Sequence, residues 1–183
     1  LCRVPNIMIT ISGRGYVFIN RSMKALLLQR IALFLYRLAL GHPNSVIAFQ
    51  NPDDMQFFVG HGIVKAERAI LISGAGVDLD KFQPGEEPDK PIRVMMVARV
   101  LRDKGVYEYA EAAKIARSED KNIVFSLAGA IDDGNPASLT SEEFNQLIRE
   151  GNVECLHQRS DIADLYRESH IACLPSYCEG MPK

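Results

Sequence analysis

The fold is decided by one stretch of this chain, Ile92-Arg93-Val94-Met95-Met96-Val97-Ala98, and by the segment that follows it, Arg99-Val100-Leu101-Arg102-Asp103-Lys104-Gly105. The first seven residues are mostly apolar, and a short apolar run of this length is typical of a buried strand. The Ala-rich segment 104–117 predicts a helix. A strand that leads through a short loop into a helix is the first part of a βαβ unit.

The same alternation of strand and helix continues toward the end of the chain. Further strands are predicted at 123–128, 153–156 and 171–174, and further helices at 141–150, capped by Ser141, and at 161–168. Strands that alternate with helices at this spacing indicate a parallel sheet. The second half of the chain therefore predicts a Rossmann-like domain.

A second α/β half is predicted upstream. Its strands lie at 6–12, 45–50 and 69–72, and its helices at 22–40 and from Asn51, which can cap the helix before Pro52. Residues 81–91 are rich in Pro, Gly and charged residues, the composition of a linker. We therefore expect an α/β fold of two Rossmann-like domains with parallel sheets, at 1–84 and 92–183, joined by a linker at 85–91. The chain begins without Met and stops at Lys183 in a predicted turn, so we expect both domains to be incomplete.

Charge is segregated along the chain. Residues 1–52 contain six basic side chains and no Asp or Glu, whereas residues 53–183 contain 15 basic and 23 acidic side chains. This pattern is typical either of a region that faces an anionic partner, such as a membrane surface or a phosphorylated acceptor, or of a basic face in solvent. The predicted helix 22–40 is apolar around most of its circumference but carries Arg30 and Arg37 on one face. We expect it to be buried against a sheet, with a position in the membrane interface as the alternative.

The residues that follow predicted strands are candidates for chemistry, because ligands of an open parallel sheet bind at the carboxyl ends of its strands. Arg99 comes directly after one strand, and Lys104 is expected to open the next helix. Two cations at a helix N-terminus can clamp a diphosphate, although surface Arg and Lys are also common. Near the end of the chain, Glu179 can accept hydrogen bonds from sugar hydroxyls, although Glu-Gly is also an ordinary turn.

In this order, these segments resemble the GT4 family of retaining glycosyltransferases. The matching residues are Arg99…Lys104-Gly105, Leu127-Ala128-Gly129, Asp161-Ile162…Leu165-Tyr166, Pro175-Ser176…Glu179-Gly180-Met181-Pro182 and, upstream, Gly76-Val77-Asp78…Phe82. Three further segments are similar to the branch of that family that builds bacterial surface polysaccharide on polyprenyl-diphosphate carriers: Gly13-x-Gly15-Tyr16, 49–54 and 131–136. The resemblance implies a GT-B fold and the transfer of a hexose or N-acetylhexosamine from a UDP-sugar to a lipid-linked glycan, with retention.

The resemblance also implies residue roles. Arg99 and Lys104 would hold the donor diphosphate, and Glu179 would contact the donor sugar as the third catalytic residue. The expected donor-binding residues are Gly129, Gly180 and Met181, and the expected acceptor side of the cleft contains Gly13, Arg14, Gly15 and Tyr16. His157 stands where the family commonly has Gly.

No cofactor or metal is expected, because the two cations would balance the charge of the departing diphosphate. The expected partners are the UDP-sugar, the lipid-linked acceptor and the inner face of the cytoplasmic membrane, without nucleic acid, so the protein is expected to be cytoplasmic and peripherally membrane-associated. Two other classes remain open: a GT-B epimerase or phosphorylase, and a noncatalytic nucleotide-binding module. We expect the fragment by itself to be inactive.

Overall fold

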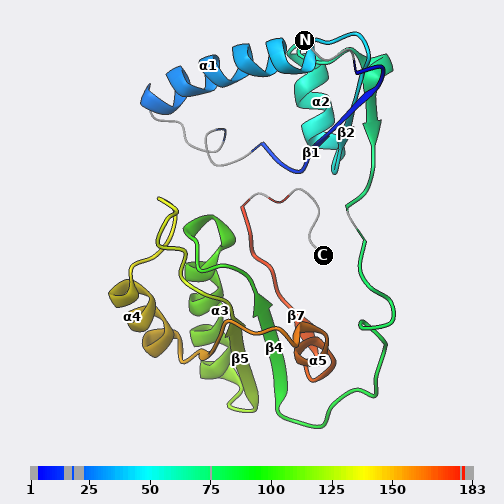
Figure 1. Ribbon diagram of the computed structural model, residues 1–183. Helices are drawn as coiled ribbons and strands as arrows, with labels where there is room; N and C mark the ends of the chain where they lie inside the picture. Colours follow the sequence, from blue (N-terminus) through cyan, green and yellow to red (C-terminus); the bar gives the residue numbers. More distant parts are fainter. Residues whose placement is uncertain (1–3, 15–17, 19–22, 75, 178, 180–183) are drawn as a thin grey trace. The chain divides into compact units, whose positions relative to one another are not determined.

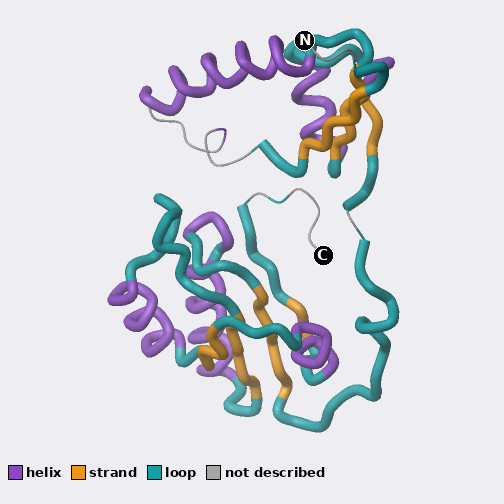
Figure 2. Tube along the Cα trace, in the orientation of Figure 1, coloured by secondary structure: helices purple, strands orange, loops and turns teal. Residues whose placement is uncertain are grey.

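A computed structural model describes residues 4–14, 18, 23–74, 76–177 and 179. The chain divides into two compact units, Leu1–Val77 with Glu179–Lys183 and Asp78–Cys178. Each unit contains one parallel sheet with helices between its strands (Figures 1 and 2). The α/β class with parallel sheets predicted from the alternating pattern is therefore confirmed.

The first unit has a three-stranded parallel sheet in the order β1-β2-β3. Its elements are β1 (Ile7–Ile11), α1 (Met23–Leu40), β2 (Ser45–Phe49), α2 (Pro52–Gly60), the 3-10 turn η2 (Ala66–Arg68) and β3 (Ala69–Leu71). The middle strand is the most deeply buried, and Phe49 at its end packs on Phe58 of α2 with ring centroids 5.4 Å apart. As predicted, Asn51 caps α2 and Pro52 begins it.

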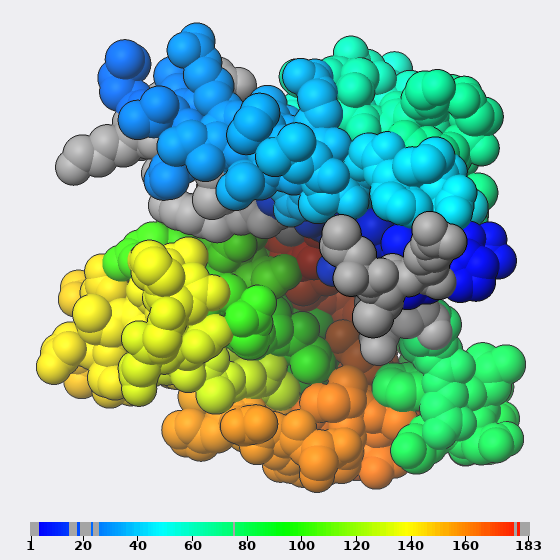
Figure 3. Space-filling model, turned by 45° about the horizontal axis from the view of Figure 1, so that its top comes forward, coloured from blue at the N-terminus to red at the C-terminus, as the bar shows by residue number. Residues whose placement is uncertain are grey.

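Most of α1 is exposed, and the prediction that this helix is buried against a sheet is wrong for much of its length. Leu33, Tyr36 and Leu40 pack on the core of the first unit. The rest of the helix extends beyond the sheet in Figure 1, and its side chains form part of the surface in Figure 3, where they are coloured blue. The exposed apolar side chains include Leu26, Leu27, Leu28, Ile31, Phe34, Leu35 and Leu38. A helix that is apolar around most of its circumference can place only one stripe against a sheet, so the remaining apolar surface stays uncovered in the described chain.

The second unit has a four-stranded parallel sheet in the order β6-β5-β4-β7. Its elements are β4 (Ile92–Val97), the 3-10 turn η3 (Arg102–Lys104), α3 (Val106–Glu119), β5 (Ile123–Ala128), α4 (Ser141–Gly151), β6 (Glu154–His157), α5 (Ile162–Arg167) and β7 (Ile171–Ala172). The chain adds β5 and β6 on one side of β4 and then returns to place β7 on the other side. The strands all run parallel, but the order in which they are added reverses at β4, and such a reversal of strand order is a topological switch point, where α/β proteins form their binding crevice.

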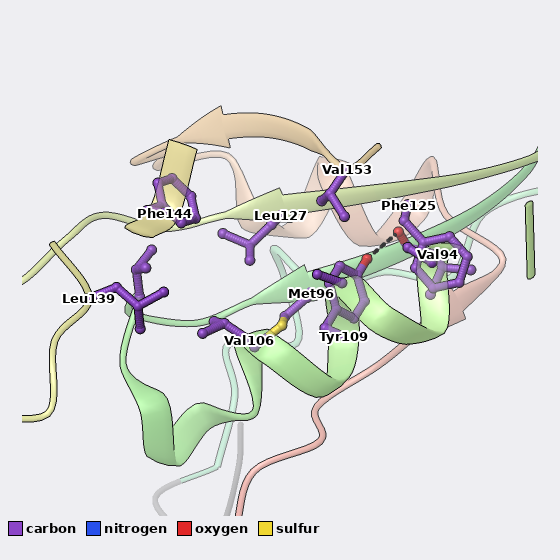
Figure 4. Packing of buried hydrophobic residues seen from close by; sticks show 12 residues of the cluster. Val94, Met96, Val106, Tyr109, Phe125, Leu127, Leu139, Phe144 and Val153 are labelled. Atoms are coloured by element: carbon purple, nitrogen blue, oxygen red, sulfur yellow. Dashed lines mark hydrogen bonds between the residues drawn. The ribbon is translucent and has the colours of Figure 1, made fainter. Parts of the chain in front are cut away.

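The core of the second unit lies between this sheet and helices α3 and α4, and it centres on Tyr109 (Figure 4). Tyr109 is 1% exposed, and its hydroxyl lies 2.9 Å from the carbonyl oxygens of Val94 and Ser126 on two neighbouring strands. Burial raises the pKa of this hydroxyl. The hydrogen-bonded ring therefore ties α3 to both central strands without leaving a buried donor unpaired.

Two helix starts differ from the prediction. Helix α3 begins at Val106 rather than at Lys104, because Gly105 adopts a left-handed φ of 75° and separates it from the turn η3. Helix α4 is capped by Thr140 rather than by Ser141, in a capping box in which the Thr140 and Glu143 side chains each bond the backbone N–H of the other residue.

The segment predicted as a linker is held by α5 and the turn after it. The Arg167 side chain packs where a Cβ atom on Gly85 would lie, 2.7 Å from the Arg167 Cγ. His170 Nδ1 accepts the Arg93 N–H at 3.0 Å, so the ring proton is on Nε2, which donates to the Pro88 carbonyl oxygen at 2.9 Å. In the division given above, residues 85–91 accordingly belong to the second unit.

Candidate donor-nucleotide site

The carboxyl ends of β4, β5 and β6 meet at a pocket of about 360 Å³ in the second unit. The pocket is lined by the end of β4 with Arg99, by the start of the loop after β5 with Gly129 and Asp132, and by Gln158 and Arg159 before α5. The structure thus brings together two of the residues predicted for the donor, Arg99 and Gly129.

Arg99 is held at this pocket by a carboxylate that the sequence interpretation did not assign to the site. Its Nη1 donates to Asp132 Oδ2 at 2.8 Å, with the side chains 61% and 34% exposed. Asp132 is itself oriented from behind, because its backbone N–H donates to Ser138 Oγ at 3.1 Å. An exposed ion pair of this kind is weak in solvent, so an incoming polyanion can replace the carboxylate on Arg99.

Gly129 is required by the close approach of two strand ends. A Cβ atom at this position would lie 1.8 Å from the Ala98 carbonyl oxygen. Its N–H donates to the His157 carbonyl oxygen at 2.8 Å, which links the ends of β5 and β6. Gly129, which lines the pocket, therefore lets the backbones of neighbouring strands come together there.

His157 adopts a left-handed backbone conformation, with φ of 54°. This conformation is unfavourable for most side chains and natural for glycine. The backbone conformation of His157 therefore agrees with the expectation that Gly is common at this position in the family that the chain resembles. The His157 side chain is exposed, next to the pocket-lining residues Gln158 and Arg159.

Arg159 adds a second cation to the rim of the pocket. Its Nε donates to Asp161 Oδ1 at 2.8 Å. This hydrogen bond lowers the pKa of the Asp161 carboxyl to about 2. Asp161 is therefore ionised across the ordinary pH range and pairs with the cation on the pocket rim.

The loops after β4 and β7 are in contact with each other. A Cβ atom on Gly105 would lie 2.1 Å from the Pro175 carbonyl oxygen, and the Tyr177 N–H donates to the Asp103 carbonyl oxygen at 2.9 Å. Lys104 lies between these contacts, half-buried, in the turn η3 rather than at the start of α3. The contact therefore fixes the backbone beside Lys104.

Two buried side-chain oxygens in these loops have no hydrogen-bond partner within the described ranges, namely Asp103 Oδ1 and Ser176 Oγ. Buried polar atoms are normally hydrogen-bonded, so unmet ones mark places where a bound molecule or water completes the structure. The sequence interpretation assigned no role at the site to either residue, or to Asp132 and Arg159, although Ser176 and Asp132 lie in segments that carry the resemblance. All four follow strands or lie beside residues that do, which is the signal that could have identified them.

The remaining predicted site residues lie away from this pocket or outside the described residues. Glu179 is half-buried and is grouped with the first unit. Gly13 and Arg14 follow β1 in the first unit, where Arg14 Nε lies 2.6 Å from Asp54 Oδ1. Gly15, Tyr16, Gly180 and Met181 are outside the described residues.

Neither a metal cluster nor a spanning helix is found in the described part of the chain. No three His, Cys, Asp or Glu side chains there gather in a way that could hold a metal ion. No helix among those residues is both long and apolar enough to cross a membrane.

Known proteins resemble this chain at both the sequence and the structural level. Over 98% of its length, it is 31% identical to N,N'-diacetylbacillosaminyl-diphospho-undecaprenol alpha-1,3-N-acetylgalactosaminyltransferase from Campylobacter jejuni, 49% of which it covers. It is 30% identical over 58% of its length to the putative teichuronic acid biosynthesis glycosyltransferase TuaC from Bacillus subtilis, 27% of which it covers. The crystal structure of HepE from Anabaena, in complex with UDP and glucose, matches 96% of this chain and 47% of that chain with a TM-score of 0.66 and 14% identity.

These likenesses establish family and fold. The chain spans about half the length of its Campylobacter relative, and the structural neighbour, at low identity, shows the fold alone. Residues 78–183, more than half of the chain, match the family described as glycosyl transferases group 1. The chain therefore belongs to the glycosyl transferases of group 1 and has the GT-B fold that its ordered motifs predict.

Proposed function

We propose that the protein containing this chain transfers a hexose or N-acetylhexosamine from a UDP-sugar to a polyprenyl-diphosphate-linked glycan, with retention, in the synthesis of bacterial surface polysaccharide. The observation that carries the proposal is the placement of Arg99 and Gly129 on one pocket at the carboxyl edge of the second sheet. The names of the Campylobacter and Bacillus relatives support the choice of a lipid-linked acceptor and a cell-surface product.

The proposed chemistry depends on the charge of the leaving UDP. As the bond between sugar and diphosphate breaks, negative charge grows on the diphosphate oxygens, and cations placed there in advance lower the barrier. Arg99 exchanges its exposed contact with Asp132 for a contact with the diphosphate, and Lys104 supplies the second charge from the turn η3. In this proposal no metal ion takes part.

Glu179 is proposed to hold the donor sugar. Its carboxylate would accept hydrogen bonds from sugar hydroxyls, and the backbone amides of Gly180 and Met181 would donate to the sugar or the diphosphate. Gly13, Arg14, Gly15 and Tyr16 are proposed to contact the acceptor side. The closeness of the Pro175 loop to the Lys104 turn supports this grouping, because it anchors the segment that leads to Glu179.

The exposed face of α1 supports peripheral attachment to the inner face of the cytoplasmic membrane. Leu27, Ile31, Phe34 and Leu38 recur with helical spacing and are 62%, 49%, 59% and 65% exposed. Arg30 is exposed beside this stripe, and α1 contains no acidic residue. Arg37 instead turns toward the body of the unit, where its Nη2 donates to the His61 carbonyl oxygen at 2.8 Å. An apolar stripe flanked by a cation suits the interface of an anionic bilayer.

The test is the release of UDP by the full-length protein, measured with and without a lipid-linked glycan acceptor, followed by NMR of the anomeric proton of the product. We expect UDP release that depends on the acceptor. We also expect the anomeric bond in the product to have the same configuration, axial or equatorial, as the anomeric bond in the donor. Release that needs no acceptor, with a free altered sugar as product, would support an epimerase. Binding of UDP without turnover would support the noncatalytic module.

A further inference from the structure

The first unit holds a buried carboxylate against an arginine at the carboxyl edge of its sheet. Arg14 lies in the loop after β1, and its Nε is 2.6 Å from Asp54 Oδ1 in the first turn of α2. The Asp54 side chain is 3% exposed and that of Arg14 is 29% exposed. The pair therefore has one end removed from water and one end that reaches the surface.

The burial of Asp54 is not required by the helix that carries it. Asn51 already caps α2, since its Oδ1 accepts the Asp54 N–H at 2.7 Å and its Nδ2 donates to Asp54 Oδ2 at 3.0 Å. A carboxylate in the first turn also interacts with the helix dipole from an exposed position, as Asp53 does. Because removing a carboxylate from water is unfavourable unless a cation lies beside it, the contact with Arg14 is what accounts for a buried Asp54.

Two groups fix the Arg14 guanidinium while part of the side chain stays exposed. Asp54 lies on one side, and the Phe57 ring lies beneath, with its centroid 4.9 Å from Arg14 Cζ. The contact with Asp54 is an ion pair without an aligned hydrogen bond, because the buried Nε–H finds no acceptor among the described residues. Because Nε is buried, the 29% of the Arg14 side chain that stays exposed lies elsewhere on that side chain, and a planar guanidinium held in place is suited to binding phosphoryl oxygens.

The location agrees with such a role. Arg14 follows the end of β1 and Asp54 follows the end of β2, and these parallel neighbours have their carboxyl ends at the same edge of the sheet. We propose that Asp54 is a positioning residue, which holds the Arg14 guanidinium against Phe57 so that it binds a phosphoryl oxygen of a substrate. This inference rests on the function proposed above, in which the donor and the acceptor each carry a diphosphate.

The experiment uses the full-length protein and measures kcat, the KM for the UDP-sugar and the KM for the lipid-linked acceptor. Asp54→Asn removes the charge with little change in shape, and Arg14→Gln removes the guanidinium. We expect each variant to raise the KM for one substrate at least tenfold, and the substrate affected identifies which diphosphate Arg14 binds. Asp53→Asn, on the same helical turn but exposed, is the control and is expected to leave both KM values unchanged.

A merely structural ion pair predicts a different pattern. Arg14→Lys keeps the charge but loses the planar donors, so a structural role predicts a normal KM, whereas positioning predicts a KM as high as that of Arg14→Gln. The double variant of Asp54→Asn with Arg14→Gln is expected to be no worse than Arg14→Gln alone, because Asp54 acts through Arg14. If Asp54→Asn fails to fold in a thermal scan, Asp54→Glu, which displaces the charge by one methylene, is expected to raise the same KM.

Normal KM values for both substrates in folded Asp54→Asn and Arg14→Gln would overturn the positioning role. If the wild-type protein transfers no sugar, the proposed function fails and the positioning role is decided by calorimetry. In that case both variants are expected to bind inorganic diphosphate at least tenfold more weakly than the wild type, in an Arg99→Ala background that weakens the donor pocket. Equal affinities there would overturn it.

Discussion

Gly105 packs so closely against Pro175 that a Cβ atom on Gly105 would lie 2.1 Å from the Pro175 carbonyl oxygen. The contact joins the loop after β4 to the loop after β7, the two strands that flank the switch point of the second sheet. Lys104, one of the two proposed diphosphate ligands, directly precedes Gly105. The geometry of the proposed clamp therefore depends on a residue without a side chain.

Replacing Gly105 with Ala is expected to lower the free energy of unfolding by about 2 kcal/mol or more, because the left-handed backbone and the clash with Pro175 both act against a side chain. Urea denaturation followed by circular dichroism measures the change. Gly60→Ala is the control, since a Cβ atom there has nothing within 4 Å and α2 should gain slightly in stability. A Gly105→Ala protein as stable as the wild type would show that the two loops separate at little cost.

The diphosphate clamp predicts that Arg99→Ala and Lys104→Ala in the full-length protein each reduce kcat/KM at least tenfold, about 1.4 kcal/mol of transition-state stabilisation. Each cation balances charge that develops on the leaving UDP. Steady-state kinetics at saturating acceptor measures the loss, and Lys114→Ala, an exposed cation on α3, serves as the control. Near-normal rates in both variants would remove the clamp from the mechanism.

The proposal without a metal predicts that transfer continues in the presence of EDTA. Side-chain cations would provide the charge that a divalent ion supplies in other transferases. The measurement is UDP release by full-length protein that has been dialysed against chelator and assayed with and without added Mg²⁺ or Mn²⁺. Activity that disappears with EDTA and returns with either ion would contradict the assignment of this role to Arg99 and Lys104.

The Arg159–Asp161 pair predicts a low carboxyl pKa on the pocket rim. Asp161 has a pKa of about 2 in the folded chain, below the value of about 3.9 for an unfolded Asp. This pair therefore stabilises the fold fully above about pH 4, and the contribution is lost as the pH falls toward 2. Arg159→Gln is expected to return the pKa to about 4, as followed by NMR titration of the Asp161 carboxyl carbon. A wild-type Asp161 that already titrates near pH 4 would show that the pair is absent in solution.

Membrane attachment through α1 predicts that the full-length protein sediments with vesicles rich in anionic lipid and leaves them as the salt concentration rises. Each cation near such a surface contributes roughly 1 kcal/mol, and salt screens it. Arg30→Gln is expected to weaken binding about fivefold, and Phe34→Ser to weaken it further by removing inserted apolar surface. Arg117→Gln in the second unit is the control. Equal binding to neutral vesicles would show that the charge of Arg30 plays no part in attachment, and no binding at low salt would show that α1 does not attach to the membrane.

Local pattern was enough to determine the elements of this protein and its family. The apolar run 92–98 becomes β4, and Asn51-Pro52 begins α2, because these outcomes depend on burial periodicity and on capping groups within a few residues. The ordered motifs likewise predicted the family through their resemblance to it, and the match over residues 78–183 confirms that prediction. The cap of α4 is Thr140, one residue before the predicted cap Ser141, because element boundaries are the least certain part of a prediction from local sequence.

Tertiary structure decided what the site residues touch. Arg99 meets Asp132, Gly105 meets Pro175 and Arg14 meets Asp54, and none of these pairs is close in the sequence. These contacts depend on the order β6-β5-β4-β7 in one unit and β1-β2-β3 in the other, and strand order is set by long-range packing rather than by local periodicity. The same reason explains the exposure of α1. Its sequence is apolar around most of its circumference, and only packing against the sheet determines which part is covered.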